Sequence, residues 1–222
     1  KKVNVFQDQA TFILVPDTRK ALQQIASYQR GQFSKPVVGI TGSNGKTIVK
    51  EWLGQVLGQS FTVAKSPKSY NSQVGVPLSI FGIQPYHQVA ILEAGISRSG
   101  EMKSLESMIK PDLGIFTTIG SAHEEGFASL GEKIQEKLRL FQDTKLLIYC
   151  QDMVEIAKEI EASFPKDRLV AWSVSPGSDF TVSHKIIESK TRLFLVAHDL
   201  RAFTFLVPFT DKASVENVTH VI

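Results

Sequence analysis

The sequence predicts an α/β fold, in which a mostly parallel sheet built around a phosphate-binding loop is flanked by helices and extended by an antiparallel β meander. From Pro36 to Trp172, short and continuously apolar runs alternate with helical patterns, as expected for parallel strands that are buried on both faces. A glycine-rich segment joins the first of these runs to a helix. After Gly177, apolar and polar residues alternate, which is typical of antiparallel strands with one solvated face.

Length and composition exclude several classes of protein. The chain has 222 residues, of which 42% are hydrophobic and 21% charged, so it is neither collagen-like nor disordered. At roughly 100–200 residues per domain, we expect one large domain or one domain with a piece of another. The net charge is +3 and no run of Lys or Arg exceeds the pair Lys1-Lys2, which predicts no nucleic-acid partner. The single Cys150 and the lack of an apolar stretch near ~18 residues predict a cytoplasmic protein with no membrane partner.

The first stretch of the chain is expected to precede the sheet. Its apolar residues 11–15 predict a short strand, and Asp17 is expected to cap a helix that runs to about Arg30. The polar residues 31–35 follow. They predict a boundary with a preceding domain.

The strands are expected in two groups. The parallel strands are predicted at residues 37–40, 89–92, 113–116, 146–149 and 169–172. Because sites in such folds lie at the carboxyl ends of the strands, we look for chemistry there. The antiparallel strands are predicted at residues 180–182, 185–187, 192–196 and 203–207. A helix is expected to begin near Ala213 and to continue beyond Ile222.

The first parallel strand runs into a segment with the features of a phosphate loop, Thr41-Gly42-Ser43-Asn44-Gly45-Lys46-Thr47. Glycines let backbone N–H groups approach phosphates, and the following helix adds partial positive charge at its N-terminus. Lys46 would reach the β- and γ-phosphates, and the Thr47 hydroxyl would bind Mg²⁺. The general pattern has a glycine where this chain has Ile40. The loop is therefore predicted to be a compact variant in which Gly42 makes the turn.

Two residues follow neighbouring strands at the same edge of the sheet. Glu93 ends the strand at 89–92, where a nucleotide-bound Mg²⁺ needs an acidic partner. A solvated acid at a strand end is the alternative. His123 lies on the loop after the next strand, and on its own it is more simply a surface residue.

Lys137 occupies an unusual position in a helix predicted from about Ser129 to Gln142. It projects from the apolar stripe of that helix, whereas Lys133 and Arg139 lie off the stripe. Burial favours the neutral amine, which can take up CO₂ as a carbamate and so supply an anionic metal ligand. The alternative is a side chain whose stem packs while its head reaches water. Periodicity alone favours that second interpretation.

Other polar positions carry weaker signals. Residues 69–77 form a polar loop that includes Asn71 and Ser72, and this loop could line a substrate cleft or be an ordinary surface loop. Cys150 follows an apolar strand and is expected to be a buried thiol rather than a nucleophile. Asp8, Asp17 and Asp112 are interpreted as caps or turn residues.

Taken together, these residues resemble the central ATP-binding domain of the Mur ligase family. The resemblance covers about Pro36 to Ile222 and includes the compact phosphate loop, Glu93-Ala94-Gly95, Gly100-Glu101-Met102, residues 118–123 and Lys137, in the family's order. Residues 71–77 and 123–130 are similar to the branch that adds D-alanyl-D-alanine to UDP-N-acetylmuramoyl-tripeptide. Residues 41–52 and 207–211 are similar to the ligase half of bifunctional proteins with an alanine racemase downstream.

The resemblance implies an ATP-dependent ligase of peptidoglycan synthesis. ATP would phosphorylate the tripeptide carboxylate, and the amine of D-alanyl-D-alanine would attack the resulting acyl phosphate. ATP would be held by Gly42, Ser43, Asn44, Gly45 and Lys46. One Mg²⁺ would be bound by Thr47 and Glu93, and a second Mg²⁺ by His123 and carbamylated Lys137. Lys46, His123 and Lys137 would be the catalytic residues, and Asn71 and Ser72 would contact substrate. Of the family's adenine-contacting element only Asn217 matches, and Thr118 stands where the family usually has Asn.

The resemblance also implies how the chain is divided. Residues 1–34 would be the end of the family's UDP-binding N-terminal domain and a linker helix, and residues 35–222 the central domain without its C-terminal partner. We therefore expect weak nucleotide binding and no ligation by these residues alone. The alternatives are a folylpolyglutamate synthase or another amide-forming relative, and a non-catalytic nucleotide-binding domain. A kinase or GTPase would assign no role to Lys137.

Overall fold

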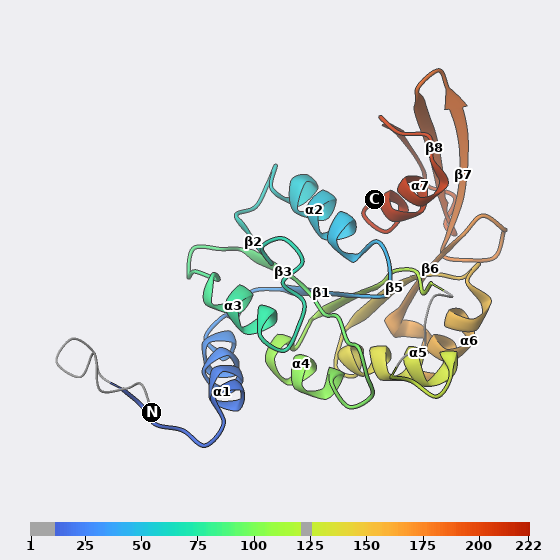
Figure 1. Cartoon of the computed structure of the whole chain (residues 1–222). Coiled ribbons are helices and arrows are strands. Elements are labelled where there is room, and N and C mark those ends of the chain that lie inside the picture. The colour runs from blue at the N-terminus through green and yellow to red at the C-terminus, as the bar shows by residue number, and fades with distance from the viewer. Residues whose placement is uncertain (1–11, 121–125) are drawn as a thin grey trace.

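The computed structural model describes residues 12–120 and 126–222 and contains one nine-stranded mixed sheet (Figure 1). The strand order is β2-β3-β1-β4-β5-β6-β7-β8-β9. Neighbouring strands are parallel from β2 to β7 and antiparallel from β7 to β9. The predicted α/β class with an antiparallel extension is confirmed. The strands are β1 (Val37–Thr41), β2 (Val63–Lys65), β3 (Val89–Glu93), β4 (Leu113–Phe116), β5 (Leu146–Cys150), β6 (Leu169–Ser173), β7 (Phe180–Ile187), β8 (Lys190–Ala197) and β9 (Ala202–Val207).

Helices cover both faces of the sheet. On one face, α1, α3, α4, α5 and α6 pack over the largest hydrophobic cluster, and on the other face lie α2 and α7 (Figure 1). The α-helices are α1 (Thr18–Gly31), α2 (Lys46–Leu57), α3 (Gly75–Phe81), α4 (Met102–Ile109), α5 (Leu130–Leu138), α6 (Val154–Ser163) and α7 (Lys212–Thr219). Short 3-10 helices span Arg139–Phe141 and Lys166–Arg168. None of the described helices combines the length and apolarity that a membrane span requires.

Strand β1 is the point at which the order of strands along the chain changes direction. It is buried throughout and pairs with β3 on one side and β4 on the other, with Ile40 beside Glu93 and Thr41 beside Phe116. Loops that leave neighbouring strands at such a point run to opposite faces of the sheet and leave a crevice at the carboxyl edge. The phosphate loop follows β1 and therefore lies at this edge.

The first described helix is capped at its N-terminus and is fixed to the body of the molecule at its C-terminus. Asp17 caps α1 as predicted, and its carboxylate accepts a hydrogen bond from the N–H of Lys20 at 3.0 Å, which lowers the pKa of Asp17. At the other end, the buried guanidinium of Arg30 donates to the carbonyls of Ile109 and Lys110. Helix α1 thus packs on α4 and shares its hydrophobic core.

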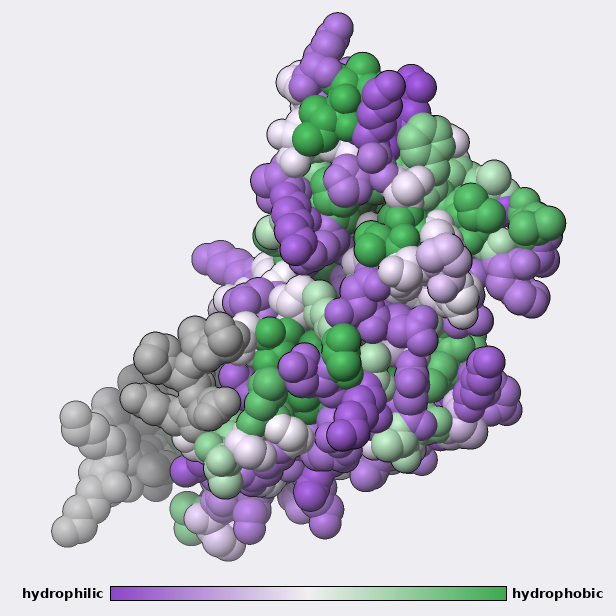
Figure 2. All heavy atoms as spheres, turned by 90° about the vertical axis from the view of Figure 1, so that its right-hand side faces the viewer, coloured by the Kyte–Doolittle hydropathy of each residue, from purple (hydrophilic) through white to green (hydrophobic). Residues whose placement is uncertain are grey.

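The antiparallel strands form a projection from the body of the molecule (Figures 1 and 2). Figure 2 shows hydrophobic side chains among hydrophilic ones on this projection. The exposed large hydrophobic residues of these strands are Ile186, Val196, Phe203 and Leu206. The predicted alternation is present in β8, where buried residues such as Leu193 and Leu195 take every second position, and one face of these strands remains in contact with solvent.

Several predicted boundaries are wrong. Residues 12–15 form no strand, because no described segment pairs with them and Leu14 is 96% exposed. The predicted strands at 180–182 and 185–187 are one continuous strand, β7, since β8 pairs with its whole length. Helix α7 ends within the described chain at Thr219, where the N–H of His220 donates to the carbonyl of Val218.

Candidate functional site

The phosphate loop, residues 42–45, links β1 to α2 and requires glycine at two positions. Gly42 has φ +146° and Gly45 has φ +82°, backbone conformations that L side chains rarely adopt. A Cβ at Gly42 would also collide with the Thr117 hydroxyl, and one at Gly45 with the Asn217 side chain. The structure therefore confirms that Gly42 makes the turn and that Ile40 needs no glycine in its place.

The segment that follows β4 holds the loop from one side. The carbonyl of Thr118 accepts the N–H groups of Ser43 at 2.7 Å and Asn44 at 3.4 Å. The Thr117 hydroxyl donates to the carbonyl of Asn44 at 2.6 Å. Because Thr118 acts through its backbone, its departure from the family's usual Asn leaves these loop contacts unaffected.

Lys46 lies over the loop that precedes it. Its Nζ donates to the carbonyls of Gly42 and Ser43, both at 3.0 Å. Burial lowers the pKa of Lys46, and the nearby Glu93 carboxylate partly opposes this shift. A cavity of about 280 Å³ lies on the loop and is lined by Ser43, Asn44, Gly45, Lys46, Thr47 and Ile48.

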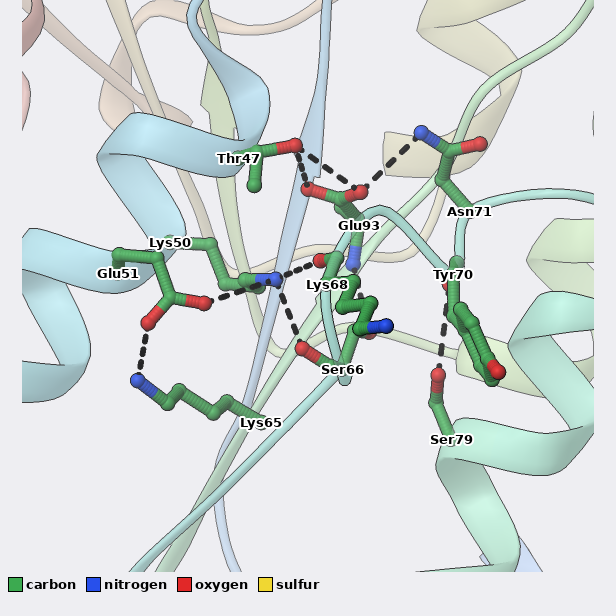
Figure 3. Close-up of polar contacts among 10 residues, drawn as sticks. All are labelled: Thr47, Lys50, Glu51, Lys65, Ser66, Lys68, Tyr70, Asn71, Ser79 and Glu93. Carbon is green, nitrogen blue, oxygen red and sulfur yellow. Dashed lines mark hydrogen bonds and ion pairs between the residues drawn. The ribbon is translucent and has the colours of Figure 1, made fainter.

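Glu93, Thr47 and Asn71 converge on one point, as Figure 3 shows. The Thr47 hydroxyl donates to both carboxylate oxygens of Glu93, at 3.0 and 3.3 Å, and the Asn71 amide donates to one of them at 3.1 Å. Glu93 is fully buried, and no described Lys, Arg or His forms an ion pair with it. A buried carboxylate without a cationic partner is costly. Its oxygens and the hydroxyl are the hard donors that Mg²⁺ prefers, so these residues fit that ion.

This arrangement leaves most of the coordination sphere to other groups. Among the described residues, no three His, Cys, Asp or Glu side chains are close enough to form a metal centre. Magnesium ions on nucleotides are commonly held by one or two protein groups together with phosphate oxygens and water. Thr47 and Glu93 match that pattern.

Lys137 is buried at the other side of the phosphate loop. Its side chain is 3% exposed, and its Nζ donates to the carbonyl of Gly42 at 3.0 Å, the same oxygen that Lys46 contacts. Burial, and after it the charges of Lys46 and Lys133, lower its pKa to about 7. The interpretation of Lys137 as a residue whose head reaches water is wrong, because its amine has a protein partner. The prediction that Lys133 lies off the buried stripe is also wrong, since Lys133 is buried too.

The remaining predicted residues lie in different places. His123 falls outside the described residues, and so does Asp8. The exposed Ser72 accepts the N–H of Gly75 at 3.2 Å, at the start of α3. Asn217, on α7, is 6% exposed and packs against Gly45 of the phosphate loop. Its predicted contact with adenine stays a prediction.

Two further predictions concern single residues outside this site. Cys150 is a buried thiol as expected, and burial raises its pKa to about 11. Asp112, predicted as a cap or turn residue, uses its carboxylate for distant contacts instead: it accepts the N–H of Val37 at 3.0 Å and pairs with Lys145, and so joins the start of β4 to β1.

Sequence reasoning missed Lys50, which is fully buried on α2 between the phosphate loop and β2. On α2, Ile48 and Val56 are exposed, whereas Val49 and Leu53 face the core. The position of Lys50 three residues before the buried Leu53 is the signal that would have identified it, because i and i+3 positions share a helix face.

Comparison with known proteins identifies close relatives of this domain. The sequence profile of the Mur ligase middle domain matches residues 40–222. UDP-N-acetylmuramoyl-tripeptide--D-alanyl-D-alanine ligase from Bacillus subtilis is 36% identical over 143 residues, which cover 63% of this chain and 31% of the relative. The chain thus spans about a third of that relative.

Solved structures support the same fold. The MurF ligase from Thermotoga maritima, determined in complex with ADP, has a TM-score of 0.82 and 27% identity, covering 94% of this chain and 49% of that one. FPGS from L. casei has a TM-score of 0.70 with 14% identity, covering 95% of this chain and 62% of that one. At that identity the likeness to FPGS concerns the fold alone.

Proposed function

The chain belongs to the Mur ligase family, and from this we propose that it is the ATP-binding core of a ligase that joins D-alanyl-D-alanine to UDP-N-acetylmuramoyl-tripeptide. The observation that carries the proposal is the arrangement around one loop, with Thr47 and Glu93 on one side and the desolvated Lys137 on the other. The names of the relatives support the choice of substrates, since the Bacillus subtilis protein carries that activity in its name.

Electrostatic positioning accounts for the roles that we assign to the phosphate loop. The N–H groups of residues 42–45 and the Lys46 amine would hold the phosphates of ATP, once those of Ser43 and Asn44 exchange the Thr118 carbonyl for phosphate oxygens. Thr47 and Glu93 would hold Mg²⁺. The bound ion would neutralise charge on the transferred phosphoryl group. Lys46 now contacts two carbonyls of its own loop. It would exchange these neutral acceptors for phosphate oxygens, which form stronger hydrogen bonds because they are charged.

The chemistry of Lys137 supports carbamylation. A pKa of about 7 leaves about half of the amine neutral at neutral pH. The neutral nitrogen can form a bond to CO₂ and release one proton to solvent. The resulting carbamate would replace a positive charge beside Lys46 by a negative one, and the repulsion between the two amines would become attraction. With His123, the carbamate would hold a second Mg²⁺.

The contacts with substrates and with other domains are further parts of the proposal. Asn71 and Ser72 would contact the UDP-muramoyl tripeptide, and Asn217 would contact adenine. Residues 1–34 would end an N-terminal domain, and an alanine racemase would be a further partner in the same protein. The chain spans less than half of each MurF relative described above, and regions that correspond to the flanking parts of those relatives would complete the substrate sites.

Two alternatives are less well supported. A folylpolyglutamate synthase-like ligase would share the fold, but among the solved structures the identity falls from 27% for the MurF ligase to 14% for FPGS. A non-catalytic nucleotide-binding domain would have no reason to bury the Lys137 amine beside the phosphate loop, because burial of an amine is costly.

A domain exchange tests the proposal. Residues 40–222 would replace the matching region of the Bacillus subtilis relative, and phosphate release from ATP would be measured with each pair of substrates. We expect release that depends on both UDP-N-acetylmuramoyl-tripeptide and D-alanyl-D-alanine, and none from the 222-residue chain by itself. A folded chimera that binds ATP but releases no phosphate with that pair of substrates would count against the proposal. The matched control carries Lys137→Met, which should bind ATP but release no phosphate.

A further inference from the structure

Lys50 is a fully buried lysine one turn beyond the phosphate loop, with all of its hydrogen-bonding capacity used. Its ammonium group donates to the carbonyl of Ser66 at 2.7 Å and to the carbonyl of Lys68, and it forms an ion pair with Glu51 at 3.1 Å (Figure 3). An ammonium group has three N–H donors, and these are three acceptors. The charge is therefore compensated although it has no contact with water.

Two of those acceptors belong to segment 66–71, which joins the end of β2 to Asn71. Lys68 in this segment has φ +45°, a left-handed conformation that is unfavourable for a residue with a side chain. Its carbonyl points at Lys50 in that conformation. The buried ammonium thus stabilises a backbone shape that segment 66–71 would not favour by itself.

Segment 66–71 in turn contacts Glu93 at two places. Near its start, the Ser66 hydroxyl accepts the N–H of Glu93 at 3.4 Å, and the N–H of Ser66 donates to the carbonyl of Ile91 at 3.0 Å. At its end, the Asn71 amide donates to the Glu93 carboxylate at 3.1 Å, and the Asn71 carbonyl accepts the N–H of Gly95. Lys50 is therefore linked to the Glu93 carboxylate through segment 66–71, with hydrogen bonds from Lys50 to the backbone of this segment and from Asn71 at its end to the carboxylate.

We propose that Lys50 is a positioning residue for the magnesium site: it fixes segment 66–71 so that Asn71 orients the carboxylate of Glu93. The assignment of magnesium rests on the proposed function, whereas the positioning of Asn71 does not. Outer partners of a metal ligand fix its orientation, and their removal typically weakens metal binding by about 10–100-fold. Lys50 acts one step further out, through the backbone that carries Asn71.

The surroundings of Lys50 separate this role from simple packing. An apolar side chain of similar length would fill the same space without the cost of burying a charge. Glu51, the third partner of Lys50, also pairs with Lys65, which lies at the surface and is 37% exposed. Lys65 shares the ion-pair network and touches no carbonyl of segment 66–71 in the described contacts. It is therefore the matched control.

The experiment compares Lys50→Met with Lys65→Met in the 222-residue chain. The first measurement is the side-chain amide signal of Asn71 in ¹H–¹⁵N spectra without nucleotide. We expect Lys50→Met to move this signal toward the position of an amide in water, and Lys65→Met to leave it in place. An unchanged Asn71 signal in folded Lys50→Met would overturn the proposal.

The second measurement is the gain in ATP affinity that Mg²⁺ produces, obtained by calorimetry with and without the ion. We expect this gain to fall about tenfold in Lys50→Met and in Asn71→Ala, and to be unchanged in Lys65→Met. An Asn71→Ala variant that keeps the full gain would refute the proposal even if Lys50→Met does not fold. A wild-type chain that binds no ATP would count against the proposed function, while the amide signal would still decide the role of Lys50.

Discussion

Replacing Lys137 by methionine should make the protein more stable at neutral pH. The pKa of Lys137 falls from 10.5 to about 7 because the amine is desolvated. At 1.36 kcal/mol per pKa unit, this shift means that the protonated Lys137 amine destabilises the native state by roughly 5 kcal/mol relative to the unfolded chain. Loss of the hydrogen bond to the Gly42 carbonyl offsets about 2 kcal/mol of the gain. We expect a net gain of roughly 2–3 kcal/mol, or a rise in Tm of about 5–10 °C.

The sign of the pH dependence follows from the same shift. Between pH 7 and 10.5 the unfolded chain holds a proton on Lys137 that the native state has lost, so the stability of the wild type rises with pH. Below pH 7 both states are protonated and the cost is constant. The advantage of Lys137→Met should therefore be largest at and below pH 7 and should shrink by about 1.4 kcal/mol per pH unit above it.

Urea denaturation from pH 6 to 9.5 in CO₂-free buffer would measure this difference. The control is Lys137→Arg, whose guanidinium stays charged throughout this range, so its stability relative to the Met variant should not depend on pH. A constant difference between wild type and Lys137→Met across the range would refute the reasoning. With bicarbonate added, only the wild type should gain the mass of one CO₂ and become more stable.

Three further outcomes follow from the site and its surroundings. Glu93→Gln should bind ATP without Mg²⁺ as well as the wild type does, and should lose about 10–100-fold of the affinity that Mg²⁺ adds, as measured by calorimetry. Gly42→Ala should lose roughly 3 kcal/mol of unfolding free energy in urea, because of its φ of +146° and the collision with Thr117; a loss near zero would mean that the loop adjusts freely. Cys150 should resist iodoacetamide in the folded protein and react quickly in urea, because burial raises its pKa to about 11.

The parallel sheet and the phosphate loop could be predicted because their signals are local. A strand buried on both faces is continuously apolar, and the two glycines of the loop sit where their positive φ values require them. Strand β2 gave no such signal, since it has three residues and one of them is Lys65. Residues 12–15 were predicted to be part of a strand and form none, because an apolar run becomes a strand only where a neighbouring strand pairs with it.

The site was predictable in its composition but not in its contacts. The positions of Thr47 and Glu93 after neighbouring strands placed them near each other, and the structure brings them within hydrogen-bond distance. The shared contact of Lys46 and Lys137 with one carbonyl could not be predicted, because it joins a loop to a helix far along the chain. The carbonyl partners of Lys50 likewise depend on segment 66–71, whose backbone conformation has no signature in the sequence.

The contacts between the phosphate loop and the segment after β4 also determine at which stage of folding the site can form. The hydrogen bond from Thr117 to Asn44 joins residues 73 positions apart. Closing a loop of that length costs chain entropy, and contacts of large sequence separation slow folding. Because ATP binds only the finished loop, it should slow unfolding of the protein. It should leave unchanged the rates of the folding steps that precede the docking of the segment after β4. During synthesis, residues 42–45 emerge long before they can bind a nucleotide, and they reach their final shape only after Thr118 has left the ribosome.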